Sequence, residues 1–235
     1  MEDKLTYYDV VAHLVPGTIV LGVLGLIPRV FTFPMPWPQS GLVSLAAGIP
    51  LAYALGQFVQ ALSSFAQPIY YHLWGGMPSA VILAGGSKRL TEPRLTRIIT
   101  ALSTHFHAPA DTVDERNALF SDAMALCNRE SLGRVDNFNA SYAFHRALLT
   151  TGAAASATLL AALFLALAGV GTSPHSFRPT LTFLLVIAIL FTIVEFIRAK
   201  QRGEYFSIEV LQMGYLRAID SQPPKLGQAA GAGGE

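Results

Sequence analysis

The stretch GIPLAYALGQFVQALSS, residues 48–64, carries a small or polar residue at every fourth position of an apolar run. Small side chains at this spacing let two helix backbones approach closely in lipid. Each step of four residues turns about 40° around a helix, because one turn takes 3.6 residues. We therefore expect Gly48, Ala52 and Gly56 to contact one neighbouring helix. Gln60 and Ser64 are expected to turn towards another helix or towards the cytoplasmic part of the chain.

This stretch belongs to one of four apolar runs that approach the roughly 20 residues a helix needs to cross a bilayer. The chain is only 13% charged, whereas soluble domains carry roughly 25% charged residues. Backbone polar groups in lipid must be paired within the segment, so each run is expected to be a helix. The runs cover residues 10–27, 41–62, 147–170 and 180–197. The sequence therefore predicts an all-α, integral membrane protein.

The basic residues predict how the chain is threaded. Of its 16 lysines and arginines, only Arg29 and Arg178 lie in the two short loops that follow the first and third runs. Basic residues concentrate in cytoplasmic segments. We therefore predict four transmembrane helices arranged as two hairpins, with both termini and the central segment in the cytoplasm.

Four regions follow from this threading. They are a first transmembrane hairpin at 1–71, a cytoplasmic helical segment at 72–146, a second hairpin with its juxtamembrane helix at 147–220, and a tail at 221–235. The tail contains Pro223-Pro224 and an Ala/Gly-rich end, and this composition is typical of disorder.

The central segment is predicted to contain two amphipathic helices. Thr91 is placed as the N-cap of the first, with Pro93 just inside it, and its apolar face comprises Leu95, Ile98, Ile99 and Leu102. Asp111 is placed as the N-cap of the second, and Gly133 as its stop. The apolar face of this second helix comprises Val113, Phe120, Met124 and Cys127. Two helices of this size are expected to pack on each other or on the ends of the membrane helices.

Two pairs of polar residues near the cytoplasmic mouth are candidates for ligand or proton binding. Asp9 and His13 are four apart and share a helix face, so they could relay a proton. Alternatively, Asp9 caps the helix and His13 forms a hydrogen bond inside the bundle. Gln57 and Gln60 could line a vestibule or bind a head group, or they could simply join two helices by hydrogen bonds.

Other residues are assigned to packing, lipid contact and ion pairing. Gly152 and Ser156 repeat the small-residue spacing in the third run, and they are predicted to pack against another helix. Arg198, Lys200 and Arg202 follow the fourth run, where they could hold anionic lipid or act only as a topology signal. Two ion pairs are predicted from helical spacing and proximity, Glu195 with Arg198 and Arg146 with Glu209.

The sequence assigns no catalytic residue, no metal ligand set and no cofactor. Cys127 is the only cysteine, and His105-Phe-His107 lacks a third ligand nearby. Gly85-Gly86-Ser87-Lys88 ends like a phosphate-binding loop but lacks its upstream glycine and its strand–helix context. The net charge of +1 gives no indication of a nucleic-acid partner.

Three short motifs carry a resemblance. They are Tyr8-Asp9-x6-Pro16-Gly17, Gly56-Gln57-x2-Gln60-Ala61-Leu62 and the aromatic and basic stretch at 202–215. Together they resemble a loose group of small bacterial four-pass inner-membrane proteins, some of which accompany CRISPR or other antiviral defence systems. The resemblance covers the membrane hairpins and not the central segment. It implies a location in the bacterial inner membrane and a role as a defence accessory or effector.

Two classes of function remain open at the level of the sequence. The first is a non-enzymatic protein that contacts membrane lipids and acts as a homo-oligomer or through a cytoplasmic protein partner bound at 72–146. The second is a small transporter or a lipid-processing enzyme that uses Asp9, His13 and Gln60. Two sets of variants would separate these classes. Loss of function on substitution of Gly56, but not of Asp9 and His13, would support the first class, and the opposite result would support the second.

Overall fold

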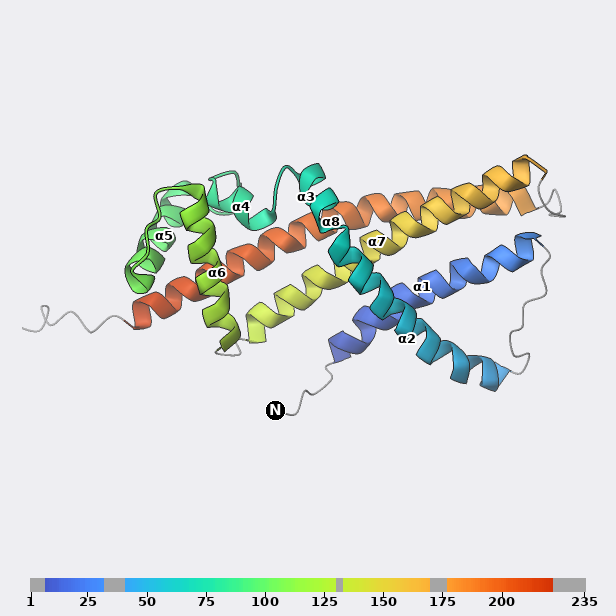
Figure 1. Ribbon diagram of the computed structural model, residues 1–235, viewed down its shortest axis with the longest axis horizontal. Helices are drawn as coiled ribbons and strands as arrows, with labels where there is room; N and C mark the ends of the chain where they lie inside the picture. Colours follow the sequence, from blue (N-terminus) through green and yellow to red (C-terminus); the bar gives the residue numbers. More distant parts are fainter. Residues whose placement is uncertain (1–6, 32–40, 130–132, 170–176, 222–235) are drawn as a thin grey trace, which may run out of the picture. The chain divides into compact units, whose positions relative to one another are not determined.

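The computed structural model describes residues 7–31, 41–129, 133–169 and 177–221, with side chains in the first range described for 10–28. Within these ranges all regular secondary structure is helical (Figure 1). The helices are α1 (Tyr7–Phe31), α2 (Gly41–Phe65), α3 (Gln67–Trp74), α4 (Pro78–Leu83), α5 (Glu92–Phe106), α6 (Val113–Arg129), α7 (Gly133–Leu167) and α8 (Phe177–Asp220). The all-α prediction is confirmed.

Four of these helices are long and apolar enough to cross a membrane, as predicted. They are α1, α2, α7 and α8, with the first span at Val10–Pro28. The predicted third and fourth runs are parts of longer helices, because α7 begins at Gly133 and α8 continues to Asp220. The extension of the last helix to about residue 219 was predicted, and Gly203 lies within it. These lengths support a multi-pass membrane protein.

The chain folds as two compact units. The first unit comprises Met1–Gly75 and Asn137–Gly203, and the second comprises Gly76–Asp136 and Glu204–Glu235. The first unit therefore contains α1, α2, α3 and most of the apolar length of α7 and α8. The second contains α4, α5, α6 and the terminal part of α8.

In the first unit, α1 and α2 pack through glycine. A Cβ atom added at Gly17 of α1 would overlap the carbonyl group of Ala52 on α2, and one added at Gly56 would overlap the carbonyl of His13. Pro16 and Gly17 are both buried. The glycine of this Pro-Gly pair is thus a point of close backbone contact between the two helices.

The buried face of α2 follows the predicted ridge and then departs from it. Ala52, Gly56, Val59 and Ser63 are its buried residues, whereas Ser64 is exposed. The step from Gly56 to Val59 is three residues rather than four. It compensates for the 40° drift, because mixed steps of three and four keep a helix face in register.

In the second unit, a hydrophobic core forms where α4, α5, α6, the start of α7 and the terminal part of α8 meet. The predicted face of α5 is confirmed, because Leu95, Ile98, Ile99 and Leu102 are all at most 6% exposed. Packing of the two amphipathic helices on each other and on the ends of longer helices is also confirmed. Further core residues are Leu119, Phe120, Ala123, Cys127, Val135, Val210 and Leu211.

Several local predictions for α6 and its surroundings were wrong. Thr112, not Asp111, caps α6: the Thr112 Oγ1 atom accepts from the Glu115 amide at 3.2 Å, and Glu115 Oε2 accepts from the Thr112 amide at 2.9 Å. Val113 is 45% exposed rather than buried. Gly133 is the first residue of α7 and not the stop of α6. A reciprocal cap of this kind outcompetes a lone aspartate, since it pairs two backbone donors at once.

Glycines in the left-handed region follow two of the short helices. α3 ends at Trp74 with Gly75 in the left-handed region (φ 83°), and Gly85 after α4 has φ 81°. At the other end of the first apolar run, α1 continues through Pro28 to Phe31. Residues 32–40, 170–176 and 222–235 lie outside the described residues, whereas Arg178 of the second predicted loop belongs to α8.

Candidate functional site: a polar cluster on α3, α7 and α8

A buried contact between a histidine and a glutamate joins the two long helices of the first unit. His145 Nδ1 on α7 lies 2.7 Å from Glu195 Oε2 on α8, and the two side chains are 11% and 5% exposed. Glu195 falls within the fourth apolar run, and His145 lies two residues before the start of the third. A carboxylate in such a place needs a partner, because an unpaired charge is costly in a low-dielectric environment.

Tyrosine hydroxyl groups connect α3 to α7 beside this pair. Tyr70 shares a hydrogen bond of 2.8 Å with Thr150, and Tyr71 shares one of 3.2 Å with Tyr142. Both bonds join residues more than 70 positions apart in the sequence. They fix the short helix α3 against the start of the apolar part of α7.

Trp74 completes this aromatic frame. Its ring centroid lies 6.0 Å from those of Tyr70 and Tyr71, and 5.9 Å from that of Phe196, the neighbour of Glu195 on α8. The side chain is only 5% exposed. α3, α7 and α8 therefore meet around one tryptophan, and we call the set Tyr70, Tyr71, Trp74, Tyr142, His145, Arg146, Thr150, Glu195, Phe196 and Lys200 the polar cluster.

Two cations belong to the polar cluster. The Lys200 ammonium group donates to the carbonyl of Trp74 at 3.0 Å, and the Arg146 guanidinium lies 5.2 Å from the ring centroid of Tyr142. Two buried donors, the Trp74 indole Nε1 and the Arg146 Nε, have no hydrogen-bond partner. Chemically, the cluster can donate hydrogen bonds to an anion. The described residues contain no group of three His, Cys, Asp or Glu side chains that could hold a metal ion.

The predicted mouth residues are brought together only in part. The ring of His13 lies 5.4 Å from that of Tyr53, and Gln57 Nε2 donates to the Tyr53 hydroxyl at 3.2 Å. The backbone carbonyl of Gln60 accepts from Ser63 and Ser64. Asp9 lies in α1, but its side chain falls outside the described residues. Tyr53 therefore links His13 to Gln57, and it was missed at the sequence level.

The predicted packing residues lie at two helix contacts. Ala52 and Gly56 are buried against α1, and Gly48 on the same helix is half-buried. In the other contact, a Cβ atom at Gly152 would lie 2.7 Å from Thr192 Oγ1, and Ser156 Oγ is 3.4 Å from the same hydroxyl. Gly152 and Ser156 thus face α8 at one threonine.

The three predicted lipid-binding cations have different surroundings. Lys200 is half-buried against Trp74, whereas Arg198 and Arg202 are exposed. The sequence treated the three residues as one group. Residues two apart on a helix, however, point in different directions. Only Lys200 belongs to the polar cluster.

Both predicted ion pairs were wrong in their partners. Glu195 pairs with His145 instead of Arg198. Glu209 pairs with Arg134, whose Nε atom lies 2.6 Å from Glu209 Oε1, instead of with Arg146. Helical spacing finds neighbours on one helix, but it cannot find a partner on another. As the lone acid of an apolar run, Glu195 signals that it must be paired across the bundle, but this signal does not identify the partner.

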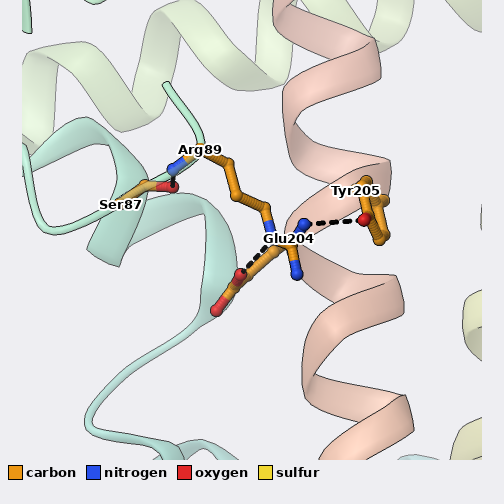
Figure 2. A network of polar contacts seen from close by, with 4 residues as sticks. All are labelled: Ser87, Arg89, Glu204 and Tyr205. Carbon is orange, nitrogen blue, oxygen red and sulfur yellow. Dashed lines mark hydrogen bonds and ion pairs between the residues drawn. The ribbon is translucent and has the colours of Figure 1, made fainter. Parts of the chain in front are cut away.

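The second unit carries a more exposed polar network. Arg89 reaches from the loop before α5 to α8, where its Nε atom lies 3.4 Å from Glu204 Oε2 and its Nη1 atom donates to Tyr205 at 2.6 Å (Figure 2). The guanidinium carbon also lies 4.4 Å from the Tyr205 ring centroid. Ser87 accepts from the Arg89 amide at 3.2 Å. This network fixes the loop before α5 to α8.

The second unit also has a groove of about 480 Å³ beside α5 and α8. Its polar lining includes Arg94, Arg97, Gln212 and Tyr215. His105 and His107 do not line this groove. His105 instead lies 2.9 Å from the Ser221 hydroxyl, and His107 ends α5 in the left-handed region.

Comparison with known proteins adds no assignment to this geometry. No protein-family model, no curated protein and no solved structure matches the chain.

Proposed function

We propose that the protein is a non-enzymatic, multi-pass membrane protein that acts by self-association. In this proposal its four spans form two hairpins with both termini in the cytoplasm. The resemblance described above favours the bacterial inner membrane and a role as a defence accessory or membrane effector. The second unit would then offer residues 76–136 to a cytoplasmic protein partner.

The observation that carries self-association is a second row of small residues, on α7. Ala153, Ala157 and Ala161 recur every four residues within the apolar part of α7, and all three are exposed. The row on α2 is already used within the chain, because Ala52 and Gly56 pack on α1. Small residues at this spacing favour close helix contact in lipid. The α7 row is therefore available to a second copy.

Cysteine crosslinking tests this arrangement directly. The chain has one native cysteine, Cys127, which is buried and would first be replaced by alanine. Ala157→Cys is then expected to give a covalent dimer in native membranes. Ile187→Cys, an exposed position on α8 that is outside the row, is the control and is expected to stay monomeric. Crosslinking at position 187 alone, or at neither position, would contradict the proposed interface.

A steric variant provides a second, independent test. Ala157→Phe should shift the protein from dimer to monomer in mild detergent, because a large ring prevents the close approach of two backbones. Ala54→Phe introduces the same ring at an exposed alanine of α2 and should leave the dimer intact. A dimer that survives Ala157→Phe would show that another surface carries association.

A second candidate function is proton-coupled transport by a small carrier, and the buried His145–Glu195 pair favours it. Intramembrane ionisable residues mark proton relays in pumps and transporters. Proteoliposomes with an entrapped pH-sensitive dye would test this function. Proton flux that is lost in His145→Asn and Glu195→Gln would support it, and flux at the level of empty liposomes for the unchanged protein would exclude it.

A further inference from the structure

The charges of the first unit are unbalanced at one end of its apolar helices. Among the side chains described in this unit, Glu195 is the only carboxylate, and His145 already occupies it. Arg146 comes one residue before the apolar run of α7, and Arg198, Lys200 and Arg202 follow that of α8. These cations therefore face the membrane boundary without acidic partners in the described part of the unit. Anionic lipid head groups are the charges available at such a boundary.

The polar cluster also contains donors that lack an acceptor. The Trp74 indole N–H and the Arg146 Nε–H are both buried and unpaired, although buried polar groups in native proteins are nearly always hydrogen-bonded. Trp74 is more than nine-tenths buried. Lys200, which donates to the Trp74 carbonyl, has three N–H groups and hence further donors to offer.

These three donors surround one aromatic frame. Tyr71 contacts Trp74 on α3 and bonds to Tyr142 on α7, and Arg146 lies over the Tyr142 ring. Arg146 and Lys200 are only half-buried, so their outer atoms meet the surroundings of the helices. A ligand that reaches the buried indole N–H would therefore enter from the side on which Arg146 and Lys200 are half-buried.

We propose that Trp74, Arg146 and Lys200 form a binding site for the phosphate group of an anionic phospholipid. The phosphate oxygens would accept from the indole N–H and from Arg146 Nε, while Lys200 supplies a second positive charge. Arg–phosphate contacts are strong because the acceptor is charged and the donors are fixed in a plane. This site differs from a general attraction of lipid to Arg198, Lys200 and Arg202, and it does not depend on self-association.

Tryptophan fluorescence can report on this site. Trp37 and Trp74 are the two tryptophans of the chain, so Trp37→Phe leaves Trp74 as the only source of tryptophan emission. The protein would be reconstituted in phosphatidylcholine nanodiscs with increasing fractions of phosphatidylglycerol. Trp74 emission is expected to shift in a saturable manner, because its indole N–H gains a charged acceptor. An emission that does not respond to phosphatidylglycerol would overturn the proposal.

Charge-matched variants separate a built site from general electrostatics. Arg146→Met and Lys200→Met should each raise the half-saturating lipid fraction about tenfold, the usual effect of losing one hydrogen bond to a charged group. Arg198→Met and Arg202→Met remove the same charge from exposed positions and should change it less than about twofold. Equal effects of all four substitutions would overturn the proposal, since they would indicate non-specific attraction.

Arg146→Lys tests whether weaker binding could result from misfolding alone. It keeps the positive charge but removes the Nε donor, so it should still weaken binding, while its melting temperature matches that of the parent. Unchanged binding in this variant would contradict the role of Arg146 Nε.

Glycerol 1-phosphate added to pure phosphatidylcholine nanodiscs tests whether the site binds a soluble phosphate ester instead of a lipid. A Trp74 response to this soluble ester, without one to phosphatidylglycerol, would refute the assignment to lipid.

Discussion

Helix α8 supplies a glutamate to an ion pair in each unit, and the two pairs differ in depth. Glu195 lies 2.7 Å from His145, and both side chains are nearly inaccessible. Glu204 lies 3.4 Å from Arg89, and these side chains are 23% and 38% exposed. The first pair joins two helices at one end of their apolar runs, whereas the second fixes a loop to a helix at the surface.

The difference in burial indicates which of the two pairs the fold depends on. Removing water from two charges costs several kcal/mol per ion, and a buried pair recovers this cost only while both partners are present. An exposed pair gains little and loses little, because water and salt screen it. A carboxylate paired with a basic side chain is thus essential for stability in the first unit, whereas it contributes little to stability in the second.

The largest expected effect comes from breaking the buried pair. Glu195→Ala should lower the free energy of unfolding by about 3–5 kcal/mol, because it leaves His145 buried without its partner. The double variant His145→Leu/Glu195→Leu should recover most of this loss, since no buried polar group remains. Unfolding of the protein in bicelles, followed by steric trapping, would measure both. A double variant as unstable as Glu195→Ala would show that the pair has a role beyond mutual compensation.

A methyl group at the α1–α2 contact should have the next largest effect. Gly56→Ala places a Cβ atom against the backbone of His13, and overpacking of this kind typically costs 1–3 kcal/mol. Gly22→Ala is the matched control, because nothing lies within 4 Å of a Cβ atom at that helical glycine of α1. The same measurement applies to both variants. Equal stability of Gly56→Ala and Gly22→Ala would mean that the two helices can separate without cost.

The same contrast explains how far the sequence could predict this protein. Apolar runs, helix caps and glycine stops depend on residues that are close in the chain, so the four spans and the face of α5 were found. The contact of Gly56 was also within reach, because small residues four apart have few other uses in an apolar helix. Physical rules of short range therefore account for most of the secondary structure and for the small residues at both helix contacts.

The polar cluster could not be found in this way, because its bonds are long-range. Tyr70 and Thr150 are 80 positions apart, and His145 and Glu195 are 50 apart. Local spacing instead suggested Arg198 for Glu195, since the two lie on one helix. Choosing His145 requires knowledge of how α7 and α8 face each other, and this depends on packing along their whole length.

The exposed network should respond weakly and in a manner that depends on salt. Arg89→Ala should destabilise the second unit by only about 0.2–1 kcal/mol at low salt, and less at 1 M salt, where the Debye length is about 3 Å. Arg94→Ala removes the same charge from an exposed position on α5 and should have almost no effect. Chemical denaturation of the full-length protein at two salt concentrations would compare them. A loss for Arg89→Ala as large as that for Glu195→Ala would break the contrast between the units.

The smallest expected effect is at the start of α6 in the second unit. The backbone amide of Thr112 donates to the Glu115 carboxylate and lowers its pKa from the ordinary value; partial burial opposes this, and the Asp111 amide and the Thr112 hydroxyl add to the lowering. Because the folded pKa is the lower one, Glu115 stabilises the folded state above the unfolded pKa of about 4.3 and loses this contribution as the pH falls further. Glu115→Gln should therefore flatten the dependence of the melting temperature on pH below about 5, and Asp114→Asn, in the same first turn, is the control for a carboxylate that does not close the cap. If the melting temperature of Glu115→Gln falls with pH as steeply as that of the parent protein, other carboxylates control the acid response. The exposed contacts of this unit would then not be independent of its core.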